Sequence, residues 1–393
     1  MIADKVDALL DLFRKRASVS IRSYRDLKEE SSGKELICYT LGDVPRELIH
    51  AAHFTPAGIV GWPDPVGKAA AYLPSFCCSL MRTSLDIGIE TEKGLISGLV
   101  LGHVCDTTRD FSGIWQRHVT MEFFHDWMPP KQMNKTSARA YAVSELRRFK
   151  TCLEAYSGAP ISDDDLEASL AVYEKQRSLL HDLKELYRKV PGLLAGPDLY
   201  CVFKASLLTE AAIFNDKVGQ LLRLLRDAPA SPVFSARPVL ITGKIPEPAQ
   251  LLGVIEEAGL FVTDDDFLWG SRIIRNAMPS EGSPVNRMAD RLLKSEPFPG
   301  YLYDRPARRE FLLKLLEKSR AEGVIFWNPK FCEPYNFDYP DLKDLFAKTG
   351  IPTLLIETEI QSSGIEQLRT RIHAFSERLM QRAKPSPAEI ERL

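Results

Sequence analysis

The sequence predicts an α/β protein with two open parallel-sheet domains, of the Rossmann or flavodoxin type, joined by a helical region. Short apolar segments alternate with helical patterns near the start of the 393-residue chain and again near its end. Long helical patterns without strands fill the middle. We therefore predict an N-terminal α/β domain over residues 1–135, a helical region over 136–235 and a C-terminal α/β domain over 236–393.

The predicted first domain alternates between strands and helices. Pro45 is suited to the first position of a helix, because its missing N–H would be unpaired there in any case. The elements predicted in this domain are helices over 1–33 and 44–54, strands over 35–40, 57–62 and 94–104, and helices that begin at Cys78 and after Cys105. Because helices separate the strands, a parallel sheet is expected.

Long helical patterns follow at 137–158, 162–189 and 197–227. Ser162 is a natural N-cap, because three aspartates follow it in the first turn. The segment 227–238 is rich in Pro and Ser and is typical of a linker. After it we predict strands over 238–243, 260–266, 324–328 and 352–359, helices over 246–259, 308–323, 339–350 and 365–380, and an irregular stretch over 271–309. This alternation indicates a second parallel sheet.

The composition is that of an ordinary soluble protein, with 45% hydrophobic residues, 26% charged residues and a formal net charge of −2. This balance does not indicate nucleic-acid binding, which normally needs a basic patch. No apolar run approaches the ~18 residues of a membrane span. Residues 1–16 are charged throughout, which is typical of an amphipathic helix rather than of a secretory signal. We expect a cytoplasmic protein that binds neither nucleic acid nor membrane.

The chain contains seven cysteines. Without a secretory signal we expect reduced thiols, which serve as core residues, metal ligands or catalysts. Cys38, Cys152 and Cys201 lie within apolar strand or helix patterns and are predicted to fill the core. No C-x-x-C pair is present, so a zinc ribbon or a ferredoxin-type site is not indicated.

Three other cysteines lie at places where an α/β sheet binds ligands. Cys78 opens a predicted helix, Cys105 ends one apolar strand and Cys332 follows another. Ligands of an open α/β sheet bind outside the carboxyl ends of its strands, so two sheets that face each other would bring Cys105 and Cys332 together. Three thiolates that meet in space could hold an iron–sulfur cluster with one iron open. Core filling is the alternative that the residues leave open.

Other strand ends carry weaker signals. Gly243 follows a predicted strand, but no G-x-x-x-x-G-K-[ST] pattern surrounds it, so nucleotide hydrolysis is not predicted. The run Asp264–Asp266 could bind a cation or a basic partner, although a solvated strand end is the more common outcome.

Histidines give two further candidates. His50 and His53 share a predicted helix face at a spacing compatible with metal binding, without the carboxylate of an H-E-x-x-H pattern. Surface or core histidines are the alternative. His103 lies two residues before Cys105 and is the best candidate for a side chain that faces the substrate or supports the cysteine.

Five segments together indicate a family: CSLMRTSLDIG, HVCDTTRDFSGIW, VLITGKIPEPAQLLGVIEEAG, DDDFLWGSR and KFCEPYNFDYPDLK. In sequence, order and spacing, they resemble the cluster-bearing subunits of the benzoyl-CoA reductase / 2-hydroxyacyl-CoA dehydratase family. The resemblance extends from Val44 to Leu379. It is greatest to the smaller cluster-bearing subunit of ATP-dependent benzoyl-CoA reductases.

The resemblance implies that Cys78, Cys105 and Cys332 ligate a [4Fe–4S] cluster in which one iron has no protein ligand. Cys77 is the competing neighbour, and the spacing to Arg82 favours Cys78. The resemblance also implies two protein partners, a homologous cluster-bearing subunit and an ATP-hydrolysing iron–sulfur activator that delivers single low-potential electrons. The substrate would be an acyl-CoA, whose thioester carbonyl accepts the electron to give a ketyl-type radical.

We therefore expect a [4Fe–4S] subunit of an ATP-dependent aroyl-CoA reductase of the benzoyl-CoA type. The first alternative is the smaller subunit of a 2-hydroxyacyl-CoA dehydratase. The second is a non-catalytic iron–sulfur carrier of the same fold. The surroundings of the cluster discriminate these functions, because an enzyme needs a cleft for a thioester and its pantetheine arm, whereas a carrier does not.

Overall fold

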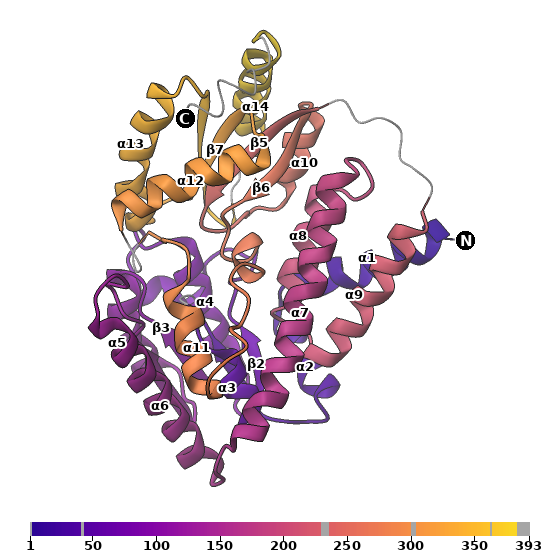
Figure 1. The fold of residues 1–393 in the computed structure, drawn as a ribbon. Coiled ribbons are helices and arrows are strands. Elements are labelled where there is room, and N and C mark those ends of the chain that lie inside the picture. Colours follow the sequence, from indigo (N-terminus) through magenta and orange to yellow (C-terminus); the bar gives the residue numbers. More distant parts are fainter. Residues whose placement is uncertain (1, 41–42, 229–235, 300–303, 362–363, 383–393) are drawn as a thin grey trace.

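Two four-stranded parallel sheets organise the chain, which confirms the predicted α/β class (Figure 1). The computed structural model describes residues 2–40, 43–228, 236–299, 304–361 and 364–382. The strands are β1 (Leu36–Tyr39), β2 (Thr55–Gly58), β3 (Ile96–Gly102), β4 (Phe123–Trp127), β5 (Arg237–Gly243), β6 (Leu260–Asp265), β7 (Gly323–Pro329) and β8 (Thr353–Thr358). Their orders, β2-β1-β3-β4 and β6-β5-β7-β8, are the same topology used twice.

Helices surround both sheets. They are α1 (Ile2–Ala17), α2 (Ile21–Glu30), α3 (Arg46–Ala51), α4 (Ser79–Glu90), α5 (Asp106–His118), α6 (Ser137–Ser157), α7 (Asp163–Lys189), α8 (Gly196–Ala205), α9 (Ala211–Arg226), α10 (Gln250–Glu257), α11 (Pro284–Leu293), α12 (Arg305–Ser319), α13 (Glu333–Lys348) and α14 (Ile365–Met380), with short 3-10 helices η1 (Lys68–Ala71) and η2 (Ser271–Ile273). None of the described helices is long and apolar enough to cross a membrane.

Alternation along the strands gives each sheet two apolar faces. In the first sheet, Cys38 and Leu99 pack with α2, α4 and α5, whereas Ile37 and Val100 pack with α3 and α6. In the second sheet, Ile325 and its neighbours pack with α10 and α14, and the opposite face packs with α12 and α13. The α2/α4/α5 face and the α10/α14 face belong to one continuous core, so the two sheets are packed together.

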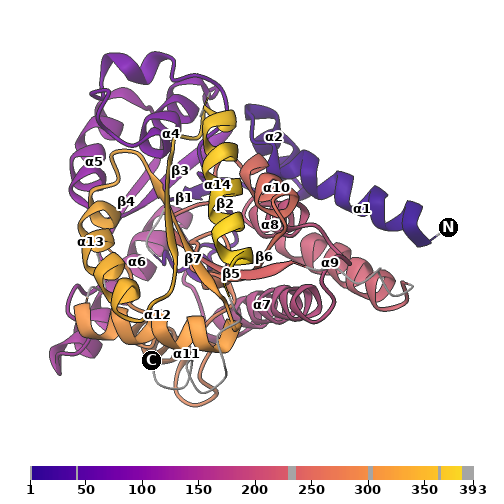
Figure 2. The ribbon, with the colours of Figure 1, turned by 90° about the horizontal axis from the view of Figure 1, so that it is seen from above.

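The middle of the chain is helical, as predicted. The N-cap predicted at Ser162 is present, since its side chain accepts a hydrogen bond from the Asp165 amide. A separate core joins α7, α8 and α9 to α1, and both views show α1 beside α8 and α9 (Figures 1 and 2). The three-part division of the chain at 135 and 235 stays a prediction, and most of the predicted linker, residues 229–235, lies outside the described residues.

The elements of the first part are close to those predicted. The segment predicted to be helical over 1–33 contains two helices, α1 and α2, because Ser20 between them adopts an extended conformation and is the N-cap of α2. The second strand is β2 at 55–58 rather than 57–62. The edge strand β4 was not predicted, because its buried positions alternate with more exposed ones and include His125, so it lacks an apolar run.

The second part differs from the prediction in the segment 271–309, which contains α11 and the start of α12. Helix α11 is short and lies in a stretch rich in Pro and Arg, so its few apolar positions did not stand out in the sequence. Helix α13 begins at Glu333 rather than at 339 and continues through Pro340. Proline inside a helix removes a hydrogen bond and usually ends the helix, which is why the sequence indicated a later start.

The run Asp264–Asp266 is neither a solvated strand end nor a cation site. All three aspartates are buried, and each is paired with basic side chains. Lys184 of α7 donates to Asp265 at 2.8 Å, Arg275 pairs with Asp264 at 3.2 Å, and Arg308 of α12 pairs with Asp266 at 2.5 Å. The network therefore ties α7 and α12 to the end of β6.

Lys184→Met is expected to lower the free energy of unfolding by about 3–5 kcal/mol at pH 7, because it leaves the buried Asp265 carboxylate without its cation. Burial alone would raise the pKa of Asp265, but Lys184, with help from the Ser271 amide and Arg275, lowers this pKa to about 2. The ion pair therefore adds stability above the unfolded-state pKa of about 3.9, and the contribution is lost as the pH falls towards the folded-state pKa.

Urea unfolding of both proteins between pH 7 and 3 measures this effect. The matched control is Lys189→Met, which removes an exposed lysine from the same helix and is expected to change stability by less than about 0.5 kcal/mol. The explanation is wrong if the two variants lose equal stability, or if the loss in Lys184→Met does not shrink below about pH 4.

Candidate functional site

The carboxyl ends of both sheets supply the candidate site. Cys105 follows β3 and Cys332 follows β7, so the two cysteines occupy equivalent positions in the repeated topology. In each sheet this position borders the point where the strand order reverses, the usual ligand-binding place of a doubly wound sheet. Lys244 follows β5, which pairs with β7, and its Nζ therefore lies 3.8 Å from Cys332 Sγ.

Each of the three candidate cysteines is the N-cap residue of a helix. Cys78 precedes α4, Cys105 precedes α5 and Cys332 precedes α13. The sequence predicted a helix start for Cys78 and Cys105, but not for Cys332. Helix N-termini present unpaired N–H groups and a partial positive charge, which stabilise a thiolate. All three thiols are thus placed where an anionic sulfur is favoured.

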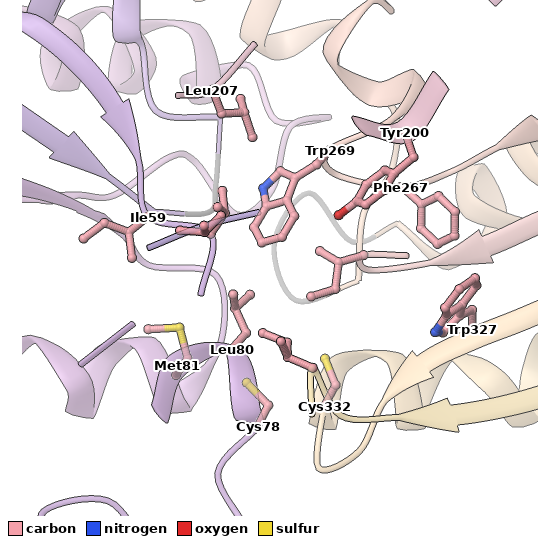
Figure 3. Packing of buried hydrophobic residues seen from close by; sticks show 14 of the residues in the cluster. Ile59, Cys78, Leu80, Met81, Tyr200, Leu207, Phe267, Trp269, Trp327 and Cys332 are labelled. Atoms are coloured by element: carbon pink, nitrogen blue, oxygen red, sulfur yellow. The ribbon is translucent and has the colours of Figure 1, made fainter. Parts of the chain in front are cut away.

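The cysteines lie in the core that joins the sheets. Cys78 and Cys332 are each only 3% exposed, and Cys105 is half-buried against the same core. Figure 3 shows the side chains of Cys78 and Cys332 next to each other, one from the start of α4 and the other from the loop after β7. Nearby, the Ile360 amide donates to Ser79 Oγ at 3.0 Å, which joins the loop after β8 to α4.

Electrostatic interactions connect the three sulfurs to one another and to Lys244. Burial raises the pKa of Cys332 to about 11, against the opposing effect of Lys244, and Cys78 and Cys105 raise it further. Burial also raises the pKa of Cys78, while Lys244 and the Met81 amide oppose the rise. The metal-free cysteines Cys78 and Cys332 are therefore neutral thiols at pH 7, and a bound metal would displace their protons.

Lys244 is a buried cation without a carboxylate. It is 2% exposed, and within the described part of the chain its ammonium has Cys332 Sγ as its hydrogen-bond partner and forms no ion pair with an acid. Burial alone would lower the pKa of Lys244, but its interactions with Cys332, Cys78 and Cys105 raise it above its ordinary value. The neighbours of this buried cation are sulfur atoms, which would be anionic once a metal displaced their protons.

Thiolates are the protein ligands of iron–sulfur clusters, so the three cysteines are a donor set that fits such a group. Among the described residues, no group of three or more His, Cys, Asp or Glu side chains is placed to hold one metal ion. In a cluster each thiolate binds a different iron, so the sulfurs lie farther apart than the ligands of a single ion. Three thiolates, helix N-termini and a buried lysine suit such an anionic group.

His103 is placed to support this region rather than to bind metal. Its Nε2 lies 2.6 Å from Asp126 Oδ1, and Ser112 donates to the other oxygen of Asp126 at 3.1 Å. Lys131 donates to the His103 carbonyl at 2.9 Å. Burial lowers the pKa of Lys131, and Cys105 opposes that effect, which places the lysine near the half-buried cysteine.

The other histidines and cysteines do not join the site. His50 is hydrogen-bonded to Ser169 at 3.0 Å, and His53 points to solvent with a positive φ of 64°. Cys38 is buried in the sheet, as predicted, but Cys152 and Cys201 are only half-buried. The predicted metal pair of His50 and His53 thus gains no support.

Cys77 is more exposed than Cys78 and does not cap α4. Burial raises the pKa of the Cys77 thiol, and Cys78 adds to the rise. The position of Cys78 at the helix N-cap makes it the better ligand candidate of the two.

Sequence reasoning missed Lys244 as a site residue. The segment LITGK contains it, directly after the glycine that ends β5. That segment carries no phosphate-binding pattern, so the lysine had no assigned role. Its position after the first strand of the second sheet, next to the strand that precedes Cys332, is the signal that could have identified it.

A separate cleft lies near the carboxyl edge of the first sheet. Its walls include Thr40 at the end of β1, Trp127 at the end of β4 and Trp269 between the two sheets. None of the three candidate cysteines lines this cleft. Leu207 and Trp269 line it and also belong to the core that contains Cys78 and Cys332.

Comparison with known proteins gives a consistent family. The family model described as 2-hydroxyglutaryl-CoA dehydratase, D-component, matches residues 42–379. The (R)-phenyllactyl-CoA dehydratase beta subunit of Clostridium sporogenes is 30% identical over 352 residues, which cover 89% of this chain and 93% of that protein. A benzoyl-CoA reductase subunit from Thauera aromatica is 28% identical over 359 residues, covering 90% and 93%. The lactoyl-CoA dehydratase beta subunit of Anaerotignum propionicum is 28% identical over 378 residues, covering 95% and 100%.

Gly243→Ala is expected to destabilise the protein by about 3 kcal/mol, because a Cβ at this position would lie 2.1 Å from the Trp327 carbonyl oxygen and would separate β5 from β7. Tyr335 of α13 donates to the Gly243 carbonyl at 3.0 Å, so the displacement would also reach the helix that Cys332 caps. Denaturant unfolding measures the change.

The matched control is Gly113→Ala in α5. No atom lies within 4 Å of a Cβ built at Gly113, and alanine favours a helix over glycine, so a gain of about 0.5–1 kcal/mol is expected. A Gly243→Ala protein as stable as the wild type would show that the close approach of the strands is not a constraint.

Proposed function

Because the chain belongs to the family of the 2-hydroxyglutaryl-CoA dehydratase D-component, we propose that it is the [4Fe–4S]-bearing subunit of an ATP-dependent acyl-CoA reductase of the benzoyl-CoA type. In this proposal Cys78, Cys105 and Cys332 hold the cluster. The observation that carries it is the convergence of three N-cap cysteines on a buried lysine that has no carboxylate partner among the described residues.

The residues of this chain would each contribute in a definite way. The three thiolates would bind the cluster, and the helix N-termini would stabilise their negative charge. Lys244 would offset part of the negative charge of the cluster and its ligands. Burial of Cys78 and Cys332 keeps water from the sulfurs. When bound, a [4Fe–4S] cluster supplies single-electron transfer, with a potential set by nearby charge, hydrogen bonds and burial.

The proposed partners follow from the same family. The relatives are subunits by name, so a homologous cluster-bearing subunit is the proposed partner. An ATP-hydrolysing iron–sulfur activator is proposed as the electron donor, and an acyl-CoA as the substrate.

A dehydratase subunit is the second candidate. It is favoured by the 30% identity to a phenyllactyl-CoA dehydratase subunit, which is similar to the identity to the reductase subunit. The burial of Cys78 and Cys332 is compatible with electron transfer in either candidate function.

Single Cys78→Ala, Cys105→Ala and Cys332→Ala variants are expected to lose most of the iron and sulfide of the anaerobically purified complex, since each removes one of three protein ligands. The wild type is expected to hold about four of each per chain. Cys77→Ala, Cys152→Ala and Cys201→Ala are the controls and should keep the cluster. Full iron and sulfide content in all three ligand variants would refute the proposed site.

The reaction is assigned by offering benzoyl-CoA and a 2-hydroxyacyl-CoA to the complex with ATP and a reduced activator. The reductase proposal expects consumption of benzoyl-CoA with formation of a dearomatised product. Turnover of the 2-hydroxyacyl-CoA alone would assign the chain to the dehydratase branch.

A further inference from the structure

An arginine-rich cleft lies apart from the cysteines. It is formed by the ends of β1 and β4, the start of α3, one face of α7, and the segment that leads from η2 into α11. Figure 1 shows α11 between α6 and α7, both of which it contacts. The carboxyl edge of a doubly wound sheet is the usual place for a ligand.

The charges that line this cleft are unbalanced. Five arginines line it, against only two acids, Asp43 and Glu47. The arginines are Arg46, Arg177, Arg272, Arg275 and Arg291. Arg272 and Arg275 are paired with aspartates of the β6 network, so the excess positive charge lies on the other wall.

Glu47 is shared by three arginines on that wall. Its side chain is 1% exposed, and its Oε1 accepts from Arg177 at 2.9 Å and from Arg291 at 3.1 Å. Burial alone would raise the pKa of Glu47, but Arg291, Arg177 and Arg46 hold it below its ordinary value. The carboxylate is therefore ionised. Its Oε1 accepts from two arginines, while its Oε2 has no hydrogen-bond partner in the described structure.

Arg46 is the third arginine near Glu47, and the ion pairs of Glu47 are with the other two. It is 8% exposed, its guanidinium lies 4.7 Å from the centre of the Tyr173 ring, and it forms no ion pair with any carboxylate of the described residues. Burial alone would lower the pKa of Arg46, but Tyr39, Tyr173 and Glu47 hold it above its ordinary value. A guanidinium carries five N–H donors, so an anionic ligand could accept from Arg46 as well. Arg46 and the partly exposed Arg291 lie on the same wall and could hold one anionic group between them.

The remaining lining is apolar. Trp127, Leu146, Leu207, Trp269, Met288 and Leu292 contribute to it. A cleft with an apolar wall and a few convergent polar groups is typical of a small-molecule site. The combination fits an organic molecule with an anionic group at one end and an apolar or aromatic part beside it.

We propose that this cleft binds a phosphate- or carboxylate-bearing organic anion, with Arg46 and Arg291 holding the anionic group and Trp269 covering the apolar part. Glu47 Oε2 accepts a hydrogen bond from a hydroxyl or N–H group of the ligand. CoA offers phosphates, hydroxyls, amides and an adenine ring, and a free aromatic acid offers a carboxylate and a ring. The site does not depend on the proposed cluster.

The test is a binding titration of the full chain, in the complex in which it is purified, with CoA, ADP and phenyllactate as separate probes. Tryptophan fluorescence and calorimetry report binding, because Trp127 and Trp269 line the cleft. Arg291→Gln and Arg46→Met are each expected to weaken binding at least tenfold, since each removes a charge-assisted contact. Binding should also weaken as salt is added.

Arg223→Gln is the matched control, because Arg223 is exposed on α9 and does not line this cleft. Arg291 is only partly buried, so its variant keeps the test valid if Arg46→Met does not fold. Binding of CoA and ADP with this sensitivity assigns a phosphate ligand, and binding of phenyllactate alone assigns a carboxylate. No binding of any probe at millimolar concentration, or binding that neither arginine variant weakens, overturns the proposal.

Iron and sulfide are measured on the same samples. If the chain binds CoA through Arg291 but holds no iron, the anion site is supported and the proposed function is refuted. If the chain holds a full cluster but binds no anion, the proposed function is supported and the anion site is refuted.

Discussion

The carboxyl edges of two parallel sheets are held against each other, and the candidate site depends on this contact. Gly61 has a positive φ of 67°, and a Cβ there would lie 2.7 Å from both Ile360 and Thr83. Gln361 donates to the Trp62 and Asp64 carbonyls at 3.2 and 2.9 Å. These contacts connect the loop after β8 to the first sheet and to α4, the helix that Cys78 caps.

Because the same topology is used twice, each sheet places a cysteine at the same position of its carboxyl edge. In both sheets the third strand in sequence lies beside the first. These third strands, β3 and β7, each lead into a helix that a cysteine caps. Facing the two sheets edge to edge therefore brings Cys105 and Cys332 to the same region, while Cys78 comes from α4, the helix that precedes β3. Lys244 follows β5 and Cys332 follows β7, so the hydrogen bonding between these two strands places the lysine beside the cysteine.

Buried ion pairs fix the surrounding helices. The aspartates at the end of β6 receive Lys184 from α7 and Arg308 from α12, and Glu247 is paired with Lys204 of α8. Such pairs are a poor source of net stability, but leaving either partner alone is costly, so they favour one arrangement of the elements. The arginine cleft differs from them because Arg46 lacks an acid partner among the described residues.

The sequence by itself determined the fold class, most strands and helices, and the candidate cysteines, because apolar periodicity and motif spacing are local properties. It did not reveal β4, which carries His125 and Asp126 among its aromatic residues, or α11, which is short and lies in a stretch rich in Pro and Arg. It also did not reveal the start of α13, which Pro340 obscured. Only the tertiary structure decided that Asp264–Asp266 are buried, that Cys332 caps a helix, and that Lys244 lies beside it. These features depend on which strands are neighbours and on which side chains meet across the chain, and local sequence does not encode either.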